Sequence, residues 1–195
     1  MTQVALFPLR VVLFPGGRLN VRVFERRYAD MISTCLKTDS PFGVCLIKHG
    51  AEVGPAAEPQ AVGTLAGIVH CDMEQPGILR VSARGGARFR IGSTEVRKDQ
   101  SLLADVSILP ERRAKMRAGH QRLADALRHL LAQAGPESHF SPPQWDDAGW
   151  VGGRLAELLP LPVSLKQALL EMDEPAARLD VLAEFFSGKS GVPNP

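Results

Sequence analysis

The spacing of apolar residues changes near Pro110, and this change is the strongest constraint on the fold. Before Pro110, short β-rich runs alternate with Gly/Pro turns, whereas after it apolar residues recur every three or four positions. The first pattern is typical of short strands and the second of amphipathic helices. We therefore predict an α+β fold with a β-rich lobe over residues 1–110, a helical lobe over 111–187 and a flexible tail over 188–195.

The β-rich lobe contains six or more short predicted strands. Residues 4–7 and 11–14 are apolar runs that each stop at a proline, which cannot donate to a sheet ladder and therefore fits the end of a strand. Leu19, Val21 and Val23 alternate with polar residues. Strands of this kind, joined mostly by short turns and with one inserted helix, are typical of a small barrel or a closed sandwich.

The inserted helix is predicted from Phe24 onward. Its apolar residues fall on one helical face, and they are Phe24, Tyr28, Met31, Ile32, Cys35 and Leu36. This face places Glu25, Arg26 and Arg27 mostly on the solvent side. We therefore interpret the charged run as the first turn of a helix that covers the sheet, and not as a reactive constellation.

The middle of the chain is rich in arginine. Gly85-Gly86 predicts either a hairpin turn or a bulge, and beyond it the alternation points Phe89 inward and Arg88 and Arg90 outward. Arginines on strands can contact phosphates, but Phe89 is the only aromatic residue between Phe42 and Phe140, so a platform for stacking bases is missing. RNA binding is therefore kept as the alternative function.

The helical lobe is predicted to contain helices over residues 111–133, 144–159, 164–172 and 175–186. Three aromatic residues lie in or near the Pro-rich connection between the first two helices: Phe140, Trp145 and Trp150. An exposed aromatic side chain can anchor a partner, although core packing would also explain these residues. We take these three as the candidate peptide-binding residues.

The sequence offers little for catalysis. Cys35, Cys45 and Cys71 are an odd number with no Cys-x-x-Cys spacing, which argues against a disulfide framework and a zinc site. Residues 187–190 resemble the end of a phosphate-binding loop, but Ala183 stands where that loop needs glycine. We expect no catalytic residues, no cofactor and no metal, with a Cys or His nucleophile that has distant partners as the alternative.

The sequence shows no signal for a membrane or for secretion. No apolar stretch reaches the roughly 18 residues needed to cross a bilayer, and the N-terminus lacks a positive region followed by a long apolar core. We therefore expect a cytoplasmic protein without a membrane partner.

Several motifs together resemble the N-terminal domain of Lon ATP-dependent proteases. In the first half they are Phe7-Pro8-Leu9-Arg10, Leu13-Phe14-Pro15-Gly16, Val23-Phe24-Glu25-Arg26-Arg27-Tyr28, Phe42-Gly43-Val44, Val62-Gly63-Thr64-Leu65-Ala66 and Arg88-Phe89-Arg90-Ile91. In the second half they are Leu155-Ala156-Glu157-Leu158-Leu159-Pro160 and Lys166-Gln167-Ala168-Leu169-Leu170-Glu171. The resemblance implies a six-stranded, barrel-like lobe related to PUA-like folds, followed by a helical bundle lobe.

The resemblance also implies a function. The family's N-terminal domain recognises protein substrates, while separate ATPase and protease domains unfold and cleave them. We find no segment that resembles those domains, and therefore expect a stand-alone, non-catalytic module that binds unfolded or exposed polypeptide segments in a groove between its lobes. A protease or chaperone is the expected further partner, and an RNA-binding PUA-like module is the alternative.

Overall fold

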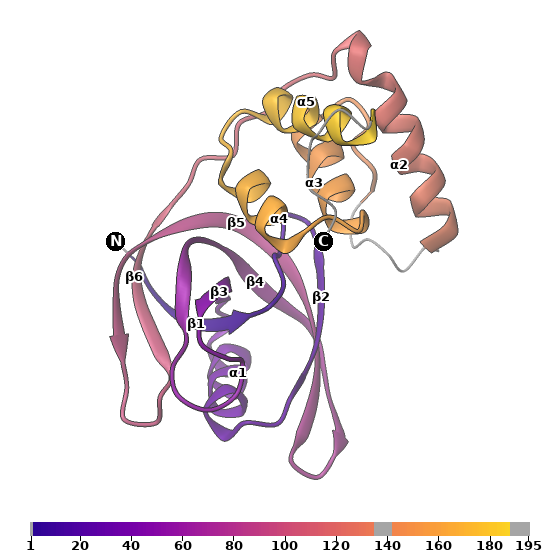
Figure 1. Ribbon diagram of the computed structural model, residues 1–195. Helices are drawn as coiled ribbons and strands as arrows, with labels where there is room; N and C mark the ends of the chain where they lie inside the picture. Colours follow the sequence, from indigo (N-terminus) through magenta and orange to yellow (C-terminus); the bar gives the residue numbers. More distant parts are fainter. Residues whose placement is uncertain (1, 135–141, 188–195) are drawn as a thin grey trace. The chain divides into compact units, whose positions relative to one another are not determined.

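The computed structural model describes residues 2–134 and 142–187, which belong to two compact units, residues 1–110 and 111–195 (Figure 1). The predicted tail over 188–195 lies outside the described residues. The first unit holds six strands and one helix: β1 (Thr2–Leu9), β2 (Arg18–Val23), α1 (Arg26–Thr38), β3 (Phe42–His49), β4 (Glu58–Gln75), β5 (Ile78–Val96) and β6 (Leu102–Ile108).

The six strands form one sheet in the order β2-β5-β4-β3-β1-β6, and β6 pairs in addition with β5. The long strand β5 makes this possible, because its first part pairs with β2 and its later part with β6. The sheet therefore curls back on itself, but β2 pairs with β5 alone, so the six strands do not close into one barrel. The prediction of an α+β fold with a six-stranded sheet is confirmed, and the barrel is only partial.

The interior of the first unit is packed around large aromatic residues. Phe89 is fully buried, and it lies against Gly43 and Gly63 so closely that a Cβ at either glycine would come within 3 Å of its ring. The two glycines thus provide the room that this ring occupies. On the other side of the unit, Phe7 stacks on Tyr28 of α1 with ring centroids 4.3 Å apart.

The predicted core face of α1 is correct in its middle and wrong at its ends. Tyr28, Met31, Ile32 and Cys35 are buried, but Phe24 lies before the first helical residue and is 58% exposed. Leu36 is 52% exposed as well. The helix begins only at Arg26, so the helical spacing does not apply to Phe24.

Two arginines predicted to face solvent are buried. The side chain of Arg27 is only 5% exposed, and Arg88 is 1% exposed. The register between β4 and β5 shifts between Thr64 and Ala66, which confirms a bulge near Gly85-Gly86 instead of a hairpin turn. The bulge breaks the alternation of inward and outward side chains, and Arg88 is enclosed next to Phe89.

In its described residues, the second unit consists of helices together with an isolated antiparallel bridge between Lys115 and Asp147. It contains a short 3-10 turn, η1 (Ala118–His120), followed by α2 (Gln121–Ala134), α3 (Ala148–Leu158), α4 (Val163–Glu171) and α5 (Pro175–Phe186). The first helix was predicted to begin at Glu111, but α2 begins only at Gln121. The buried Arg178 of α5 donates to the carbonyl oxygens of Leu169 and Met172 at 2.9 Å each, so it joins α5 to the end of α4.

None of the helices in the described part of the chain has the length and apolar character that crossing a lipid bilayer requires.

Candidate functional site

A pocket of about 370 Å³ opens beside strand β2 in the first unit. Its wall is formed by the end of β1 and the segment after it, residues 19–23 of β2, the start of α1 and the loop after β3. We call it the β2 pocket, and its lining residues are Phe7, Leu9, Val11, Leu19, Asn20, Val21, Arg22, Val23, Phe24, Glu25, Tyr28, Glu52 and Val53.

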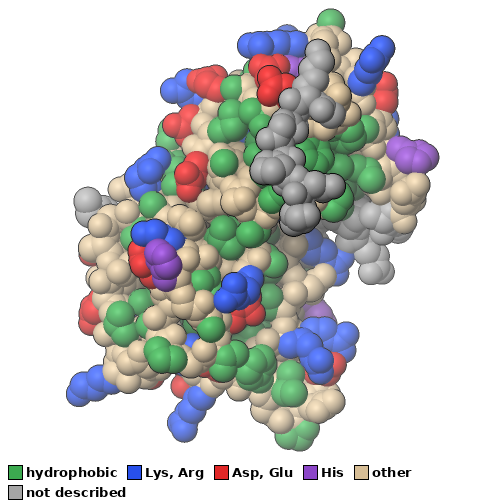
Figure 2. All heavy atoms as spheres, in the orientation of Figure 1, with side chains coloured by type: hydrophobic (Ala, Val, Ile, Leu, Met, Phe, Trp, Pro, Cys, Tyr) green, Lys and Arg blue, Asp and Glu red, His purple; other side chains and the backbone are tan. Residues whose placement is uncertain are grey.

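The mouth of the β2 pocket carries three large apolar side chains that face water. Val11 is 46% exposed, Phe24 58% and Val53 54%, although they come from three different segments of the chain. Figure 2 shows apolar side chains interspersed with lysine and arginine side chains on the visible face of this unit. Exposed apolar side chains that converge on one concavity are a mark of a binding site, because water solvates them poorly.

The floor of the β2 pocket is aromatic. The stacked rings of Phe7 and Tyr28 both line it, and each of these residues is only 5% exposed. Burial raises the pKa of the Tyr28 hydroxyl above its ordinary value, and the nearby Arg27 charge opposes this shift only in part. The hydroxyl therefore stays neutral near pH 7 and adds no charge to the floor.

The charged groups of the rim are already engaged. The Arg22 guanidinium contacts the Glu74 carboxylate at 2.9 Å, and the Glu25 carboxylate contacts Arg27 at 3.0 Å. The Glu52 carboxylate accepts a hydrogen bond of 2.6 Å from the backbone N–H of Arg10, which holds the loop after β3 against the end of β1. The rim thus supplies shape, while the floor and mouth supply apolar surface.

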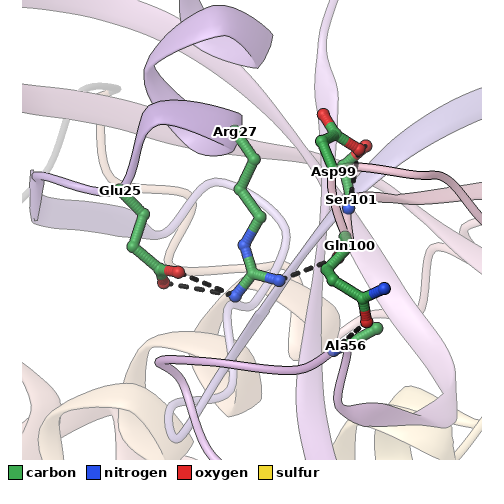
Figure 3. Close-up of polar contacts among 6 residues, drawn as sticks. All are labelled: Glu25, Arg27, Ala56, Asp99, Gln100 and Ser101. Carbon is green, nitrogen blue, oxygen red and sulfur yellow. Dashed lines mark hydrogen bonds and ion pairs between the residues drawn. The ribbon is translucent and has the colours of Figure 1, made fainter.

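Arg27 fixes the start of α1 and with it the position of Phe24. In Figure 3 the guanidinium lies between the Glu25 carboxylate and the turn that joins β5 to β6. Its Nη1 donates to the carbonyl oxygen of Gln100 at 2.8 Å, and the side-chain oxygen of Gln100 accepts from the backbone N–H of Ala56 at 3.2 Å. Sequence reasoning missed this anchor, because its partner is 73 residues away.

The candidate peptide-binding residues of the sequence analysis belong to the second unit. Phe140 lies outside the described residues. Trp145 and Trp150 are half-buried and pack edge to face with ring centroids 5.3 Å apart, and the Arg128 guanidinium lies 4.7 Å from the centre of the Trp145 ring. The structure therefore brings the two tryptophans together, and their role in binding stays a prediction.

The described residues give little support for a metal site or for a nucleophilic cysteine. No three or more His, Cys, Asp or Glu side chains among them are arranged to hold a metal ion. The cysteines Cys35, Cys45 and Cys71 are free, and burial raises the pKa of each thiol. A thiol with a raised pKa is a poor nucleophile, because the thiolate is the reactive form.

Comparison with known protein families gives one match that spans nearly the whole chain. The model of the ATP-dependent protease La (LON) substrate-binding domain matches residues 3–187. Among curated proteins, the chain is 26% identical to Lon protease 2 of Myxococcus xanthus and 27% identical to Lon protease of Paraburkholderia phytofirmans, over 96% of this chain in each case. The chain spans about a quarter of the length of these relatives, since it covers 24% of each.

Two solved structures have the same fold. The crystal structure of a Lon N-terminal domain protein from Xanthomonas campestris is 38% identical, with a TM-score of 0.79 over 95% of this chain and 99% of that chain. The N-terminal domain of Lon protease from Mycobacterium avium complex is 17% identical, with a TM-score of 0.65 over 98% of this chain and 100% of that chain. At this lower identity, the second structure shows the fold alone.

Proposed function

The chain belongs to the family of ATP-dependent protease La (LON) substrate-binding domains, and on this premise we propose that it is a non-catalytic recognition module that binds unfolded or exposed polypeptide segments. The resemblance noted from the sequence motifs is thereby confirmed, whereas the ligand is our proposal. The observation that carries it is the β2 pocket, where Val11, Phe24 and Val53 expose apolar surface around an aromatic floor.

The physical basis of this binding is the burial of apolar surface. Each side chain of the ligand that enters the pocket gains about 25 cal/mol per Å² of apolar area removed from water, less the cost of ordering the ligand. Unfolded chains display apolar side chains that folded proteins hide, so a pocket of this kind distinguishes unfolded from folded chains. Because the charges of the rim are already paired, the part of the affinity that comes from apolar side chains in the pocket should depend little on salt.

The experiment that tests the proposal is fluorescence anisotropy of two labelled ligands at low and moderate salt. The first is a reduced, carboxymethylated polypeptide that cannot fold, and the second is a single-stranded RNA. We expect saturable binding of the polypeptide at both salt concentrations. No binding of the polypeptide at high micromolar concentration, with the protein folded by circular dichroism, contradicts the proposal.

One observation favours the RNA alternative strongly enough to keep the second ligand in the test. Arg18 and Arg22 of β2 lie directly opposite Arg84 and Arg80 of β5, so four arginines share one face of the sheet. Contacts with phosphates weaken steeply as salt rises. RNA binding that disappears at moderate salt, without polypeptide binding, would therefore replace our proposal by the alternative.

A further inference from the structure

Strand β2 has a free edge in the described part of the chain. It pairs with β5 on one side, and no second strand pairs with it on the other. The N–H of Gly85 donates to the carbonyl of Gly17 at 2.9 Å, and Gly17 directly precedes Arg18, whose partner in the ladder is Arg84. Along an antiparallel strand, every second residue forms backbone hydrogen bonds with the same neighbour, and the residues between them point to the other side. The backbone groups of Leu19 and Val21 therefore face β5, and those of Asn20 and Arg22 point away from it.

The β2 pocket runs along this free edge. A pocket over one face of a strand is lined by every second residue, because successive side chains point to opposite faces. The β2 pocket is instead lined by five consecutive residues, 19–23, and on its other side by Phe7, Leu9 and Val11. The opening thus lies beside the backbone of β2, where an additional strand would lie.

We infer that an extended segment of a bound polypeptide adds to the sheet as a further strand beside β2, with alternate side chains in the β2 pocket. This inference rests on the proposed function and specifies how the same site works. The backbone N–H groups of Asn20 and Arg22 donate to the segment and their carbonyl oxygens accept from it, which any sequence with backbone amides allows, and the pocket selects apolar side chains at alternate positions.

The charges of β2 and β5 indicate which side chains the other face of the segment carries. Arg22 and Arg80 lie opposite each other on the outer face, next to Arg84 of the same strand. Glu74 pairs with Arg22, and Asp72 of β4 lies opposite Arg80, so the four arginines of this row, with Arg18 included, still outnumber its two carboxylates. The segment that fits best therefore alternates apolar residues, which face the pocket, with acidic residues, which lie next to Arg18 and Arg22 of β2 on the face that Arg80 and Arg84 share.

The same charges argue against a second copy of this chain as the occupant. Two β2 strands paired antiparallel about Asn20 would place Arg18 of each copy opposite Arg22 of the other. Like charges directly opposite one another destabilise a strand pair. A polypeptide of different sequence is therefore the better partner for this edge.

The test uses a labelled peptide of about nine residues that alternates valine with glutamate, long enough to pass the whole of β2. Two matched peptides carry N-methyl groups, the first on all valine amides and the second on all glutamate amides. In an added strand, only the valine amides or only the glutamate amides face β2. We expect methylation of the amides that face β2 to lower the affinity about tenfold or more, and methylation of the others to change it little.

A second measurement locates the contact on the protein. Amide hydrogen exchange by NMR should slow at Asn20 and Arg22 when the unmethylated peptide is bound, while Leu19 and Val21 stay protected by β5 with and without peptide. A peptide that alternates valine with lysine serves as the charge control. It should bind several-fold more weakly, because its lysines face the arginine row.

The outcomes separate this inference from the proposed function. If both N-methylated peptides bind as well as the unmethylated peptide, and amide hydrogen exchange at Asn20 and Arg22 is unchanged, strand addition is wrong and polypeptide recognition stands. If neither the peptide nor the unfolded polypeptide binds, both proposals fail. If Asn20 and Arg22 are already protected in the free protein and it sediments as a dimer, a second copy occupies the edge and the inference is overturned.

Discussion

The guanidinium of Arg27 donates to the backbone carbonyl of Gln100 at 2.8 Å and so joins the first turn of α1 to the turn between β5 and β6. The adjacent Arg26 makes only an exposed contact with Asp30 at 3.8 Å. Two neighbouring arginines of one motif thus have different roles, because only one of them lies against the sheet.

Replacing Arg27 should therefore destabilise the protein, whereas replacing Arg26 should not. We expect Arg27→Ala to lower the free energy of unfolding by about 2–3 kcal/mol, since it removes a buried, charged side chain and its hydrogen bond to the Gln100 carbonyl. Arg26→Ala is the matched control, with an expected change below about 0.5 kcal/mol. Urea unfolding followed by circular dichroism measures both. Equal effects of the two substitutions would show that the contact with Gln100 is unimportant.

Phe24 is the exposed aromatic residue of the β2 pocket, and its removal should weaken binding without weakening the fold. Because Phe24 is 58% exposed, Phe24→Ala should change the free energy of unfolding by less than about 0.5 kcal/mol. We expect it to lower the affinity for unfolded polypeptide about tenfold. Leu36→Ala is the control, because Leu36 is similarly exposed on α1 but does not line the pocket. If both variants bind like the unmodified protein, the β2 pocket is not the site.

The two tryptophans give an independent test of the other candidate site. Trp145 and Trp150 are the only tryptophans of the chain, and they pack against each other, whereas the β2 pocket contains none. Selective excitation of tryptophan therefore reports on that pair alone. If polypeptide binds at the tryptophans, the emission should shift on binding, and Trp150→Phe should reduce the shift. An unchanged emission during saturable binding would exclude the pair as the contact.

Two glycines of β4 should respond differently to the same substitution. A Cβ at Gly63 would lie 2.5 Å from the carbonyl oxygen of Val44 and 2.7 Å from the ring of Phe89, whereas a Cβ at Gly67 would have no atom within 4 Å. We expect Gly63→Ala to destabilise the fold by about 1–3 kcal/mol, and Gly67→Ala to be neutral within about 0.5 kcal/mol. Thermal unfolding of both variants measures the difference. A neutral Gly63→Ala would show that Phe89 can move away.

Alkaline pH should destabilise the protein through Cys45. Burial raises the pKa of this thiol well above its ordinary value of 9.0, so above pH 9 the unfolded chain loses a proton that the folded chain keeps. The contribution of this thiol to the free energy of unfolding is therefore fully present below pH 9. Above pH 9 the free energy of unfolding falls by about 1.4 kcal/mol per pH unit for one such group. Urea unfolding at pH 7 and pH 10 measures the loss.

Cys45→Ala should reduce this loss, because it removes the titrating group. Cys71→Ala is the control. Burial raises the pKa of the Cys71 thiol too, but this thiol is only partly buried, whereas Cys45 is buried. An identical pH dependence in all three proteins would show that Cys45 has no part in it.

Local pattern predicted the type of most elements, although it misplaced some of their ends. The change of apolar spacing near Pro110 separates strands from helices in the structure, and α5 spans Pro175–Phe186 as its pattern predicted. Several motifs in order were enough to indicate the family that the comparisons show. Such features depend on neighbouring residues, and helical or strand periodicity records them directly.

The candidate site was not predictable in the same way. The exposure of Phe24 and the burial of Arg27 depend on where α1 begins, and the partner of Arg27 is the distant Gln100. The helical pattern alone assigned Phe24 to the core and Arg27 to solvent. No local signal distinguishes Arg26 from Arg27. They differ because the turn between β5 and β6, which carries Gln100, lies next to Arg27 alone.

The sequence by itself therefore determined the class of fold, the change from strands to helices near Pro110 and the family, but not every element, since the run over residues 11–14 forms no strand. Only the tertiary structure decided that β2 keeps one edge free and that Val11, Phe24 and Val53 meet around one pocket. The physical reason is that periodicity specifies which side of an element is apolar, whereas strand pairing between distant segments specifies what lies next to it. A binding site is made of such neighbours, and so it appears only when the chain is folded.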